Sequence, residues 1–214
     1  KKSFNSKIAK YSLLAGAALV TLNACKKDDN NDNDNNDPNI SDHDIDPDLS
    51  LTAPTNNADS YLLDVNNDGT NDLKFSTGTY IYSYYGYTYD YGYVEVEGLN
   101  NTKIVTSQQA ISINGSTINK TVANALSEGN SVSPSSTIWS NFGYLGIKGT
   151  YYNAPISAGQ FLAQDKYVGF QFSASGSTHY GWVRVSVAAD AKSFSLKEYA
   201  YHTVANEAIK AGDK

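Results

Sequence analysis

The segment from Asp64 to Asp72 has the residue types and spacing that point most directly to chemistry. It reads DVNNDGTND, with oxygen-bearing side chains at relative positions 1, 3, 5 and 9 and a glycine at position 6. Ca²⁺ binds about six to eight oxygen atoms, and alternate residues of a loop that turns sharply at a glycine can direct their oxygens to one point. The segment therefore predicts a structural calcium site, made by the side chains of Asp64, Asn66, Asp68 and Asp72 and the main-chain carbonyl of Thr70.

This loop differs from an EF-hand at relative position 12, where Phe75 stands in place of the bidentate glutamate. Its apolar flanks, Tyr61–Leu63 and Leu73–Phe75, are typical of strands rather than helices. We therefore expect a calcium loop between two β-strands, completed by water or by a carboxylate distant in the sequence. The alternative is a hydrophilic Asn/Asp/Gly turn that binds no ion.

A second candidate site is the tyrosine-rich stretch Thr79–Val96. One alternating series of tyrosines ends at Tyr84 and another begins at Tyr85, which predicts a bulge or a bend between them. Exposed tyrosine rings can stack on sugars or contact another protein. The rings could instead pack against one another or cover a sheet. The residues expected to form a ligand surface are Tyr85, Tyr87, Tyr89 and Tyr91.

Two segments with alternating apolar residues, Lys166–Ser173 and Thr178–Val187, predict adjacent core strands. The short link between them contains Gly176 and favours a hairpin. Trp182 would lie on the face opposite the valines of the second strand. Either that face is also packed, beneath a loop or another sheet, or Trp182 forms an aromatic platform for a ligand with Arg184 beside it.

The sequence contains no recognisable catalytic constellation. Its three histidines lack the spacing of metal ligands, and it has no Gly-x-Ser-x-Gly motif. Glu95 and Glu97 share one face of a predicted strand, but glycoside hydrolysis requires two carboxylates that face a cleft. We therefore expect a protein that is not an enzyme, and a secreted glycoside hydrolase is the least favoured function.

Residues 1–24 predict export from the cytoplasm. Four lysines precede Tyr11–Ala24, an almost uninterrupted run of 14 apolar and small residues. A membrane-spanning helix needs roughly 20 residues, so this layout is typical of a signal peptide. The run ends in Leu22-Asn23-Ala24-Cys25, which resembles the lipobox of bacterial lipoproteins. That resemblance implies cleavage before Cys25, lipidation of Cys25 and attachment to a membrane through the lipid; otherwise Cys25 would be a free thiol in a tail.

Residues 25–45 are rich in Asp and Asn and poor in apolar side chains, which predicts a disordered acidic tether. An acidic stretch after the lipidated cysteine resembles that of Bacteroidota-type surface lipoproteins and implies exposure on the outer membrane. Asp28 and Asp29 match this pattern, whereas Lys26 and Lys27 depart from it. The expected location is the cell envelope, in the outer membrane and exposed at the surface; the alternative is a periplasmic spacer.

The charge of the chain argues against one class of partner. Residues 1–24 hold four of the 16 basic side chains and no acidic ones, so the rest of the chain has 12 basic and 22 acidic side chains and a net charge of −10. Such a chain does not neutralise phosphates, and no nucleic-acid partner is expected. It attracts cations instead.

Residues 46–214 have the length of one domain and predict an all-β, antiparallel, sandwich-like fold. The best helix candidate is short, from Asn119 to Glu128, and would end at Gly129.

The C-terminal part of this domain resembles a group of uncharacterised secreted bacterial proteins, some with a PEP-CTERM sorting tail and others lipoproteins. The resemblance rests on YVGFQF at 167–172, THYGWVRV at 178–185 and KEYAYHT at 197–203. It implies no known activity. We therefore expect a lipid-anchored envelope protein that displays a calcium-stabilised binding or adhesion module for a glycan or a surface protein. A structural envelope or matrix protein without a small ligand is the main alternative.

Overall fold

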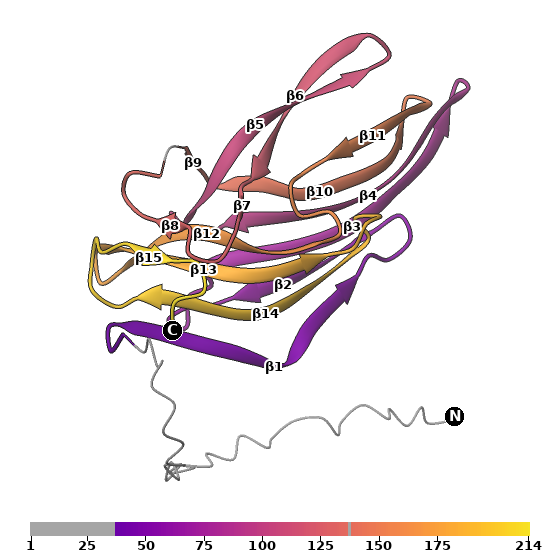
Figure 1. Cartoon of the computed structure of the whole chain (residues 1–214). Helices are drawn as coiled ribbons and strands as arrows, with labels where there is room; N and C mark the ends of the chain where they lie inside the picture. The colour runs from indigo at the N-terminus through magenta and orange to yellow at the C-terminus, as the bar shows by residue number, and fades with distance from the viewer. Residues whose placement is uncertain (1–36, 137) are drawn as a thin grey trace, which may run out of the picture. The chain divides into compact units, whose positions relative to one another are not determined.

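The computed structural model describes residues 37–136 and 138–214. The predicted signal peptide, Cys25 and the tether as far as residue 36 lie outside the described residues. Every regular element in the described ranges is a β-strand (Figure 1), and 13 of the strands form one hydrogen-bonded series. The named strands pair antiparallel except at Tyr144 and Val122. The expected all-β, antiparallel class is thereby confirmed.

The series folds into two layers. Layer A has the strand order β1-β14-β13-β12, with the short β7 beside β12. Its strands are β1 (Ile40–Thr52), β14 (Ser193–His202), β13 (Ser177–Val187), β12 (Gln164–Ala174) and β7 (Ala125–Leu126).

Layer B has the order β6-β10-β4-β3-β2, with β11 beside β10. Its strands are β6 (Ser116–Ala123), β10 (Phe142–Tyr151), β4 (Tyr87–Gly98), β3 (Leu73–Tyr84), β2 (Ala58–Leu63) and β11 (Ala154–Ala158).

Strand β5 (Lys103–Ile113) connects the two layers. Its first residues pair with β12, Ile104 facing Phe170, and the residues from Thr106 onward pair with β6. The short β9 (Trp139–Ser140) also pairs with β5. The remaining strands, β8 (Ser131–Val132) and β15 (Ile209–Lys210), pair with each other.

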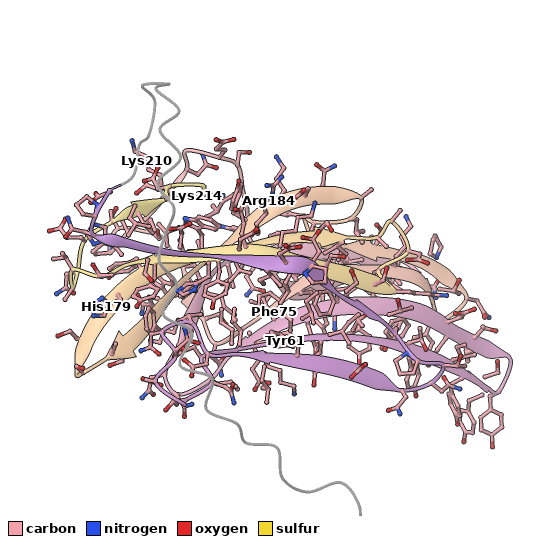
Figure 2. The ribbon with its side chains drawn as sticks, turned by 90° about the horizontal axis from the view of Figure 1, so that it is seen from below. Tyr61, Phe75, His179, Arg184, Lys210 and Lys214 are labelled. Carbon is pink, nitrogen blue, oxygen red and sulfur yellow. The ribbon has the colours of Figure 1, made fainter. Side chains whose placement is uncertain are left out.

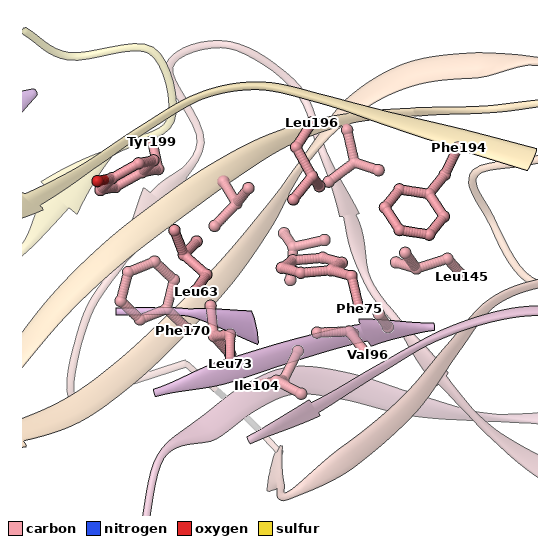
Figure 3. Packing of buried hydrophobic residues seen from close by; sticks show 14 of the residues in the cluster. Leu63, Leu73, Phe75, Val96, Ile104, Leu145, Phe170, Phe194, Leu196 and Tyr199 are labelled. Atoms are coloured by element: carbon pink, nitrogen blue, oxygen red, sulfur yellow. The ribbon is translucent and has the colours of Figure 1, made fainter. Parts of the chain in front are cut away.

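The main core lies between the layers (Figure 3). Alternate residues of each strand point inward, so Phe75 of β3 meets Phe194 of β14 with ring centroids 6.1 Å apart. Both rings are buried, and each stabilises the fold by roughly 1.5–3 kcal/mol relative to exposure to water. Phe75 also fills the position that an EF-hand glutamate would occupy, and the predicted strands on either side of the Asp64–Asp72 loop are confirmed as β2 and β3.

Two smaller apolar clusters cover the outer faces of the layers. On layer A, the strands β8 and β15 pack Val132 and Ile209 over Trp182. On layer B, the β5–β6 hairpin brings Ile111 and Ile113 against residues of β10 and β11 such as Ile147. Both layers are therefore packed on their outer sides over part of their area.

The predicted hairpin near the C-terminus is confirmed. β12 and β13 pair in register from Gln164–Val187 to Ala174–Ser177, through a turn at Ser175 and Gly176 with φ of 50° and 79°. Positive φ at both turn positions matches the right-handed twist of the paired strands.

The predicted helix from Asn119 to Glu128 is wrong. The first part of this segment belongs to β6, which pairs with β5 as far as Ala123, and β7 follows it. The segment alternates between the two faces of a sheet, since Asn119 is exposed whereas Ile118 and Lys120 on either side of it are half-buried and line one groove. Tertiary pairing therefore overrides a weak local preference.

The boundary expected at residue 46 is also wrong, because β1 begins at Ile40. Ile40 faces His202 of β14, and His43 stacks on Tyr199 with ring centroids 4.9 Å apart. Asp42 and Asp44 point to solvent between these contacts. Exposed carboxylates along an edge strand discourage pairing with another chain.

The domain has two distinct ends. At one end, the N–H of Thr203 donates to the carbonyl of Asn39 at 2.7 Å. Thr203 also lines a shallow hollow of about 410 Å³ together with Ser175 and with Asn66 of the Asp64–Asp72 loop. At the opposite end, Gly92 of β4 lies against the turn that joins β13 to β14, and the β3–β4 hairpin continues past it (Figure 1).

Candidate functional site

Both tyrosine series lie on one face of the protein. β3 and β4 are joined by a two-residue turn at Tyr85 and Gly86, with φ of 48° and 79°. Residues that face each other in an antiparallel pair point to the same side. The predicted bulge or bend is thus a tight hairpin turn, and both series share the outer face of layer B. The facing pairs are Tyr80–Tyr91, Tyr82–Tyr89 and Tyr84–Tyr87.

The tip of this hairpin extends beyond the core. Tyr84 is 56% exposed and Tyr85 is 83% exposed. Ile81, which points to the other face of β3, is 45% exposed, so both faces of the hairpin reach solvent there.

The tyrosine rings also pack against one another. Tyr89 meets Tyr151 and Tyr152 edge-on, with centroids 5.2 and 4.8 Å apart, and Tyr82 stacks with Tyr84 at 6.1 Å. The alternative interpretation, that the rings cover one another, therefore holds in part. A row of partly exposed rings nevertheless remains, with Tyr80, Tyr82 and Tyr87 each exposed.

Toward the core, this tyrosine face forms one wall of a groove with a volume of about 490 Å³. β3, β4 and β10 supply tyrosines, β6 supplies Ile118 and Lys120, and the loop before β2 supplies Asn56 and Asn57. The aromatic residues that line this tyrosine groove are Tyr80, Tyr91, Tyr93, Tyr144 and Tyr151.

Two charged side chains line the tyrosine groove. Glu95 faces Tyr144 across the β4–β10 pair, and Lys120 lies over the Tyr144 ring with its Nζ 5.6 Å from the centroid. Burial raises the pKa of the Glu95 carboxyl, the ammonium of Lys74 lowers it, and Glu97 raises it. The Glu95 charge in turn adds to the effect of burial in raising the pKa of Tyr144.

Gly78 gives Tyr93 room to lie flat across β3. Gly78 and Tyr93 face each other in the ladder, and a Cβ at Gly78 would come within 2.5 Å of the Tyr93 hydroxyl oxygen. An aromatic ring that covers a facing glycine stabilises a strand pair. The absence of a side chain at position 78 therefore fixes the position of one wall of the groove.

Side-chain hydrogen bonds link three hairpin tips at the groove end of the domain. The Asn153 Nδ2 donates to the Gly86 carbonyl at 2.8 Å, and the N–H of Thr88 donates to the Asn153 Oδ1 at 2.7 Å. The Asn114 Nδ2, from the β5–β6 turn, donates to the Tyr152 carbonyl at 2.9 Å. This tip latch, Asn153 and Asn114 with their partners, joins the β3–β4, β5–β6 and β10–β11 hairpins.

The predicted calcium residues occupy one compact loop between β2 and β3. The carboxylate of Asp64 accepts hydrogen bonds from the N–H groups of Asp68, at 3.2 Å, and Gly69, at 2.7 Å. The Asp68 carboxylate accepts one from the N–H of Thr70 at 2.8 Å. These bonds curl the loop so that the side chains of Asp64, Asn66 and Asp68 gather on its inner side.

Asp72 closes the loop and is buried. Its carboxylate accepts a hydrogen bond from the N–H of Val65 at 3.0 Å. Burial raises the pKa of Asp72 to about 6, the Val65 hydrogen bond lowers it, and the charges of Asp64 and Asp68 raise it further. The loop thus places the charge of Asp72 where water cannot fully solvate it, and a cation would relieve this cost. In the described part of the chain, no group of three or more His, Cys, Asp or Glu residues is arranged to hold a metal ion.

Trp182 is not available as a ligand platform. The ring is fully buried beneath Val132 and Ile209, and it packs edge-on against Tyr167 with centroids 5.2 Å apart. The interpretation that this face is packed is therefore the right one.

Arg184 is held by ion pairs on the outer side of layer A. Its Nε and Nη2 donate to the two carboxylate oxygens of Asp165 at 3.0 and 3.1 Å, and its Nη1 donates to Glu198 at 3.1 Å. Lys197 also binds Asp165, and Lys214 binds Glu198. Figure 2 shows Arg184 and Lys214 on the same side of the sheet. In this ion-pair cluster, the Nε, Nη1 and Nη2 donors of Arg184 are engaged by carboxylates of the domain itself.

Comparison with protein-family models, with curated protein sequences and with solved structures finds no match to this chain. No helix among the described residues is long and apolar enough to cross a membrane. The interpretation of function therefore rests on the residues themselves.

Proposed function

We propose that this chain is a lipid-anchored envelope protein whose β-domain binds a glycan in the tyrosine groove. The observation that carries the proposal is the groove of about 490 Å³, in which five tyrosines converge with Glu95, Lys120 and two asparagines. Its size lies within the range of about 300–1,000 Å³ that is typical of ligand sites. The ligand was expected to be a glycan or a protein, and the composition of the groove favours the glycan.

Sugar rings present a C–H face and a rim of hydroxyl groups. The negative face of an aromatic ring attracts the C–H groups, and carboxylate, ammonium and amide groups bond the hydroxyls. Tyr91 and Tyr151 offer rings in the groove, and Asn57 and Glu95 offer polar atoms. The row of exposed rings on the β3–β4 hairpin would extend this surface for a polymer.

The arrangement of carboxylates favours binding over hydrolysis. Glu95 is the only carboxylate among the described residues that line the groove. Glu97, the second acid considered from the sequence, is partly exposed and pairs with Lys74 at 3.6 Å. Glycoside hydrolysis by the usual route needs two carboxylates on opposite sides of the bond that breaks.

The test is a glycan array followed by calorimetry of the positive ligands. Tyr91→Ala and Tyr151→Ala should each weaken binding about ten-fold or more, equivalent to about 1.4 kcal/mol, because each removes a ring from the groove. For an oligosaccharide short enough to fill the groove alone, Tyr85→Ala is the matched control: Tyr85 is 83% exposed at the hairpin tip and does not line the groove, so this variant should bind such a ligand like the wild type. Capture of a protein ligand by the groove, with no glycan bound, would overturn the proposal.

We further propose that the loop of Asp64, Asn66, Asp68, Thr70 and Asp72 binds a structural Ca²⁺. Its spacing, the inward curl of the loop and the burial of Asp72 support this proposal. An ion that binds only the folded state raises the melting temperature. Calorimetry and thermal melting at millimolar Ca²⁺ test the site, and the absence of both heat and a melting shift would remove it.

Anchoring at Cys25 rests on the sequence pattern. Several acyl chains on one residue hold a protein durably on a membrane, whereas a single chain binds marginally. Cys25→Ser should shift the protein from the membrane fraction to the soluble fraction. Protease treatment of intact cells tests exposure at the surface: protection of the domain would indicate a periplasmic orientation.

A further inference from the structure

We infer that the tyrosine groove binds neutral glycans in preference to anionic ones, and that Glu95 determines this selectivity. This inference rests on the proposed glycan-binding function and adds the chemical class of the ligand. Glu95 lines the groove beside Tyr93 and faces Tyr144 in the ladder.

The carboxylate of Glu95 is positioned to serve a ligand. Among the described residues, it takes part in no hydrogen bond and no ion pair, since Lys74 pairs with Glu97 instead. Its facing residue on β3 is Ser76, and its facing residue on β10 is Tyr144. A half-buried carboxylate with free lone pairs between aromatic rings accepts hydrogen bonds from two neighbouring hydroxyl groups of a sugar.

The same carboxylate opposes anionic sugars. A uronate or sulfate group in the groove would meet the Glu95 charge in partly dehydrated surroundings, where like charges repel more strongly than in water. Lys120 supplies one positive charge, so Glu95 and Lys120 together balance and leave no excess charge for an anion. Residues 37–214 as a whole carry 18 acidic and ten basic side chains, and this net negative charge disfavours the approach of polyanions.

The test measures selectivity with defined polymers. Dextran, mannan and galactan serve as neutral probes, and alginate and polygalacturonate serve as anionic probes, in affinity electrophoresis and calorimetry at about 0.15 M salt, where long-range charge effects are screened. The wild type should bind at least one neutral probe and should bind the anionic probes at least ten-fold more weakly.

Glu95→Gln should weaken binding of the neutral probe about five-fold. It should also narrow the difference in affinity between neutral and anionic probes. Glu97→Gln is the matched control, because it lies on the same face of β4 but does not line the groove. That variant should keep wild-type affinity and wild-type selectivity. Thermal melting of both variants verifies that they fold.

The possible outcomes separate this inference from the proposed function. If Tyr91→Ala abolishes binding of a neutral probe while Glu95→Gln leaves affinity and selectivity unchanged, the function stands and the role of Glu95 is rejected. Equal or tighter binding of anionic probes by the wild type also rejects the inference and leaves glycan binding intact. If the wild type binds no glycan, or if Tyr91→Ala leaves glycan binding unchanged, the proposed function itself fails.

Discussion

Asp72 ties the Asp64–Asp72 loop to the fold at the level of single residues. Its carboxylate accepts a hydrogen bond from Val65, and its N–H donates to the Leu63 carbonyl at 2.8 Å. It is 6% exposed and lies near Asp64 and Asp68. A negative charge in this position costs stability unless a proton or a cation neutralises it.

The calcium-free protein should therefore lose stability as the pH rises from about 4 to about 6. Because the pKa of Asp72 is raised from 3.8 to about 6, the folded state in this window holds a proton that the unfolded state has released. Well above pH 6 the loss reaches its full value, on the order of 3 kcal/mol. Urea unfolding in the presence of a chelator measures it.

The Asp72→Asn variant is the control for this pH dependence. It should be more stable than the wild type at pH 7 without calcium, and its stability should vary less between pH 4 and 6. The variant should also lose the stabilisation by Ca²⁺. A wild-type protein whose calcium-free stability rises over this window would contradict the assignment.

The ion-pair cluster around Arg184 predicts the opposite behaviour at acid pH. Burial opposes ionisation of Asp165 and Glu198, but hydrogen bonds from Lys197 and Arg184 hold the pKa of Asp165 low, and those from Lys214 and Arg184 hold that of Glu198 low. The contribution of these two carboxylates to the free energy of unfolding is present above their unfolded pKa of about 4. It is lost as the pH falls through their lower pKa values in the folded state.

Arg184→Ala should reduce stability by about 1–2 kcal/mol at pH 7, since it leaves Asp165 and Glu198 with one lysine partner each in partly exposed surroundings. The difference should shrink in acid. Lys103→Ala, at an exposed lysine outside the cluster, should change stability by less than about 0.5 kcal/mol. Chemical unfolding at pH 7 and pH 3 tests both variants. If Arg184→Ala leaves the free energy of unfolding unchanged, the ion pairs are energetically neutral.

At the scale of the elements, local patterns predicted strands better than turns. The alternation in Lys166–Ser173 and Thr178–Val187 was sufficient for the β12–β13 hairpin, because Gly176 also favours a tight turn. The turn at Tyr85 was predicted only as a bulge or a bend and not as a hairpin turn, since tyrosine rarely adopts positive φ and only Gly86 indicated it. β1 was missed in part because its apolar residues are widely spaced among aspartates.

The groove could be predicted only in part from the sequence. Tyr91 and Glu95 stood out because they lie in one tyrosine-rich segment. Tyr151 comes from β10, which pairs with β4, and Lys120 comes from β6, which meets β10 on its other side. No local pattern in the sequence connects these strands. The Asn114-Gly115 pair, typical of a hairpin turn, was the one detectable sign of the tip latch.

The tip latch predicts a local change in stability. Asn153→Gly removes two side-chain hydrogen bonds while allowing the φ of 60° at this position, so it should cost about 1–2 kcal/mol. Hydrogen exchange should become faster in Thr88 and its neighbours, and ligand affinity should fall. Asn206→Gly is a matched control, because Asn206 has φ of 63° and its side chain makes no hydrogen bond among the described residues. Equal exchange in both variants would show that Asn153 does not hold the hairpin.

At the scale of the whole molecule, three apolar clusters stabilise one domain. The main core joins the layers, and the C-terminal segment completes the cluster on the outer side of layer A by placing Ile209 over Trp182. The last strand of the chain is therefore part of the packing rather than a tail.

Ile209→Ala should destabilise the domain by about 2–4 kcal/mol, because it opens a cavity beside a fully buried tryptophan. Val204→Ala is the comparison: this valine is 43% exposed, and its loss should cost less than about 0.5 kcal/mol. Urea unfolding followed by tryptophan fluorescence measures both. If the two variants lose similar amounts of stability, β15 is not integral to the fold.

The two ends of the domain also determine how it would carry a mechanical load. The described chain begins beside Thr203, at the end opposite the hairpin tips, and continues as β1 along β14. A pull between the N-terminal end and a ligand held near the tips would run parallel to these strands. The β1–β14 hydrogen bonds would then be sheared together rather than peeled apart one at a time, and many bonds must break at once in shear. If the proposed anchor at Cys25 holds the N-terminal end, this geometry would resist a force that flow applies to a bound ligand.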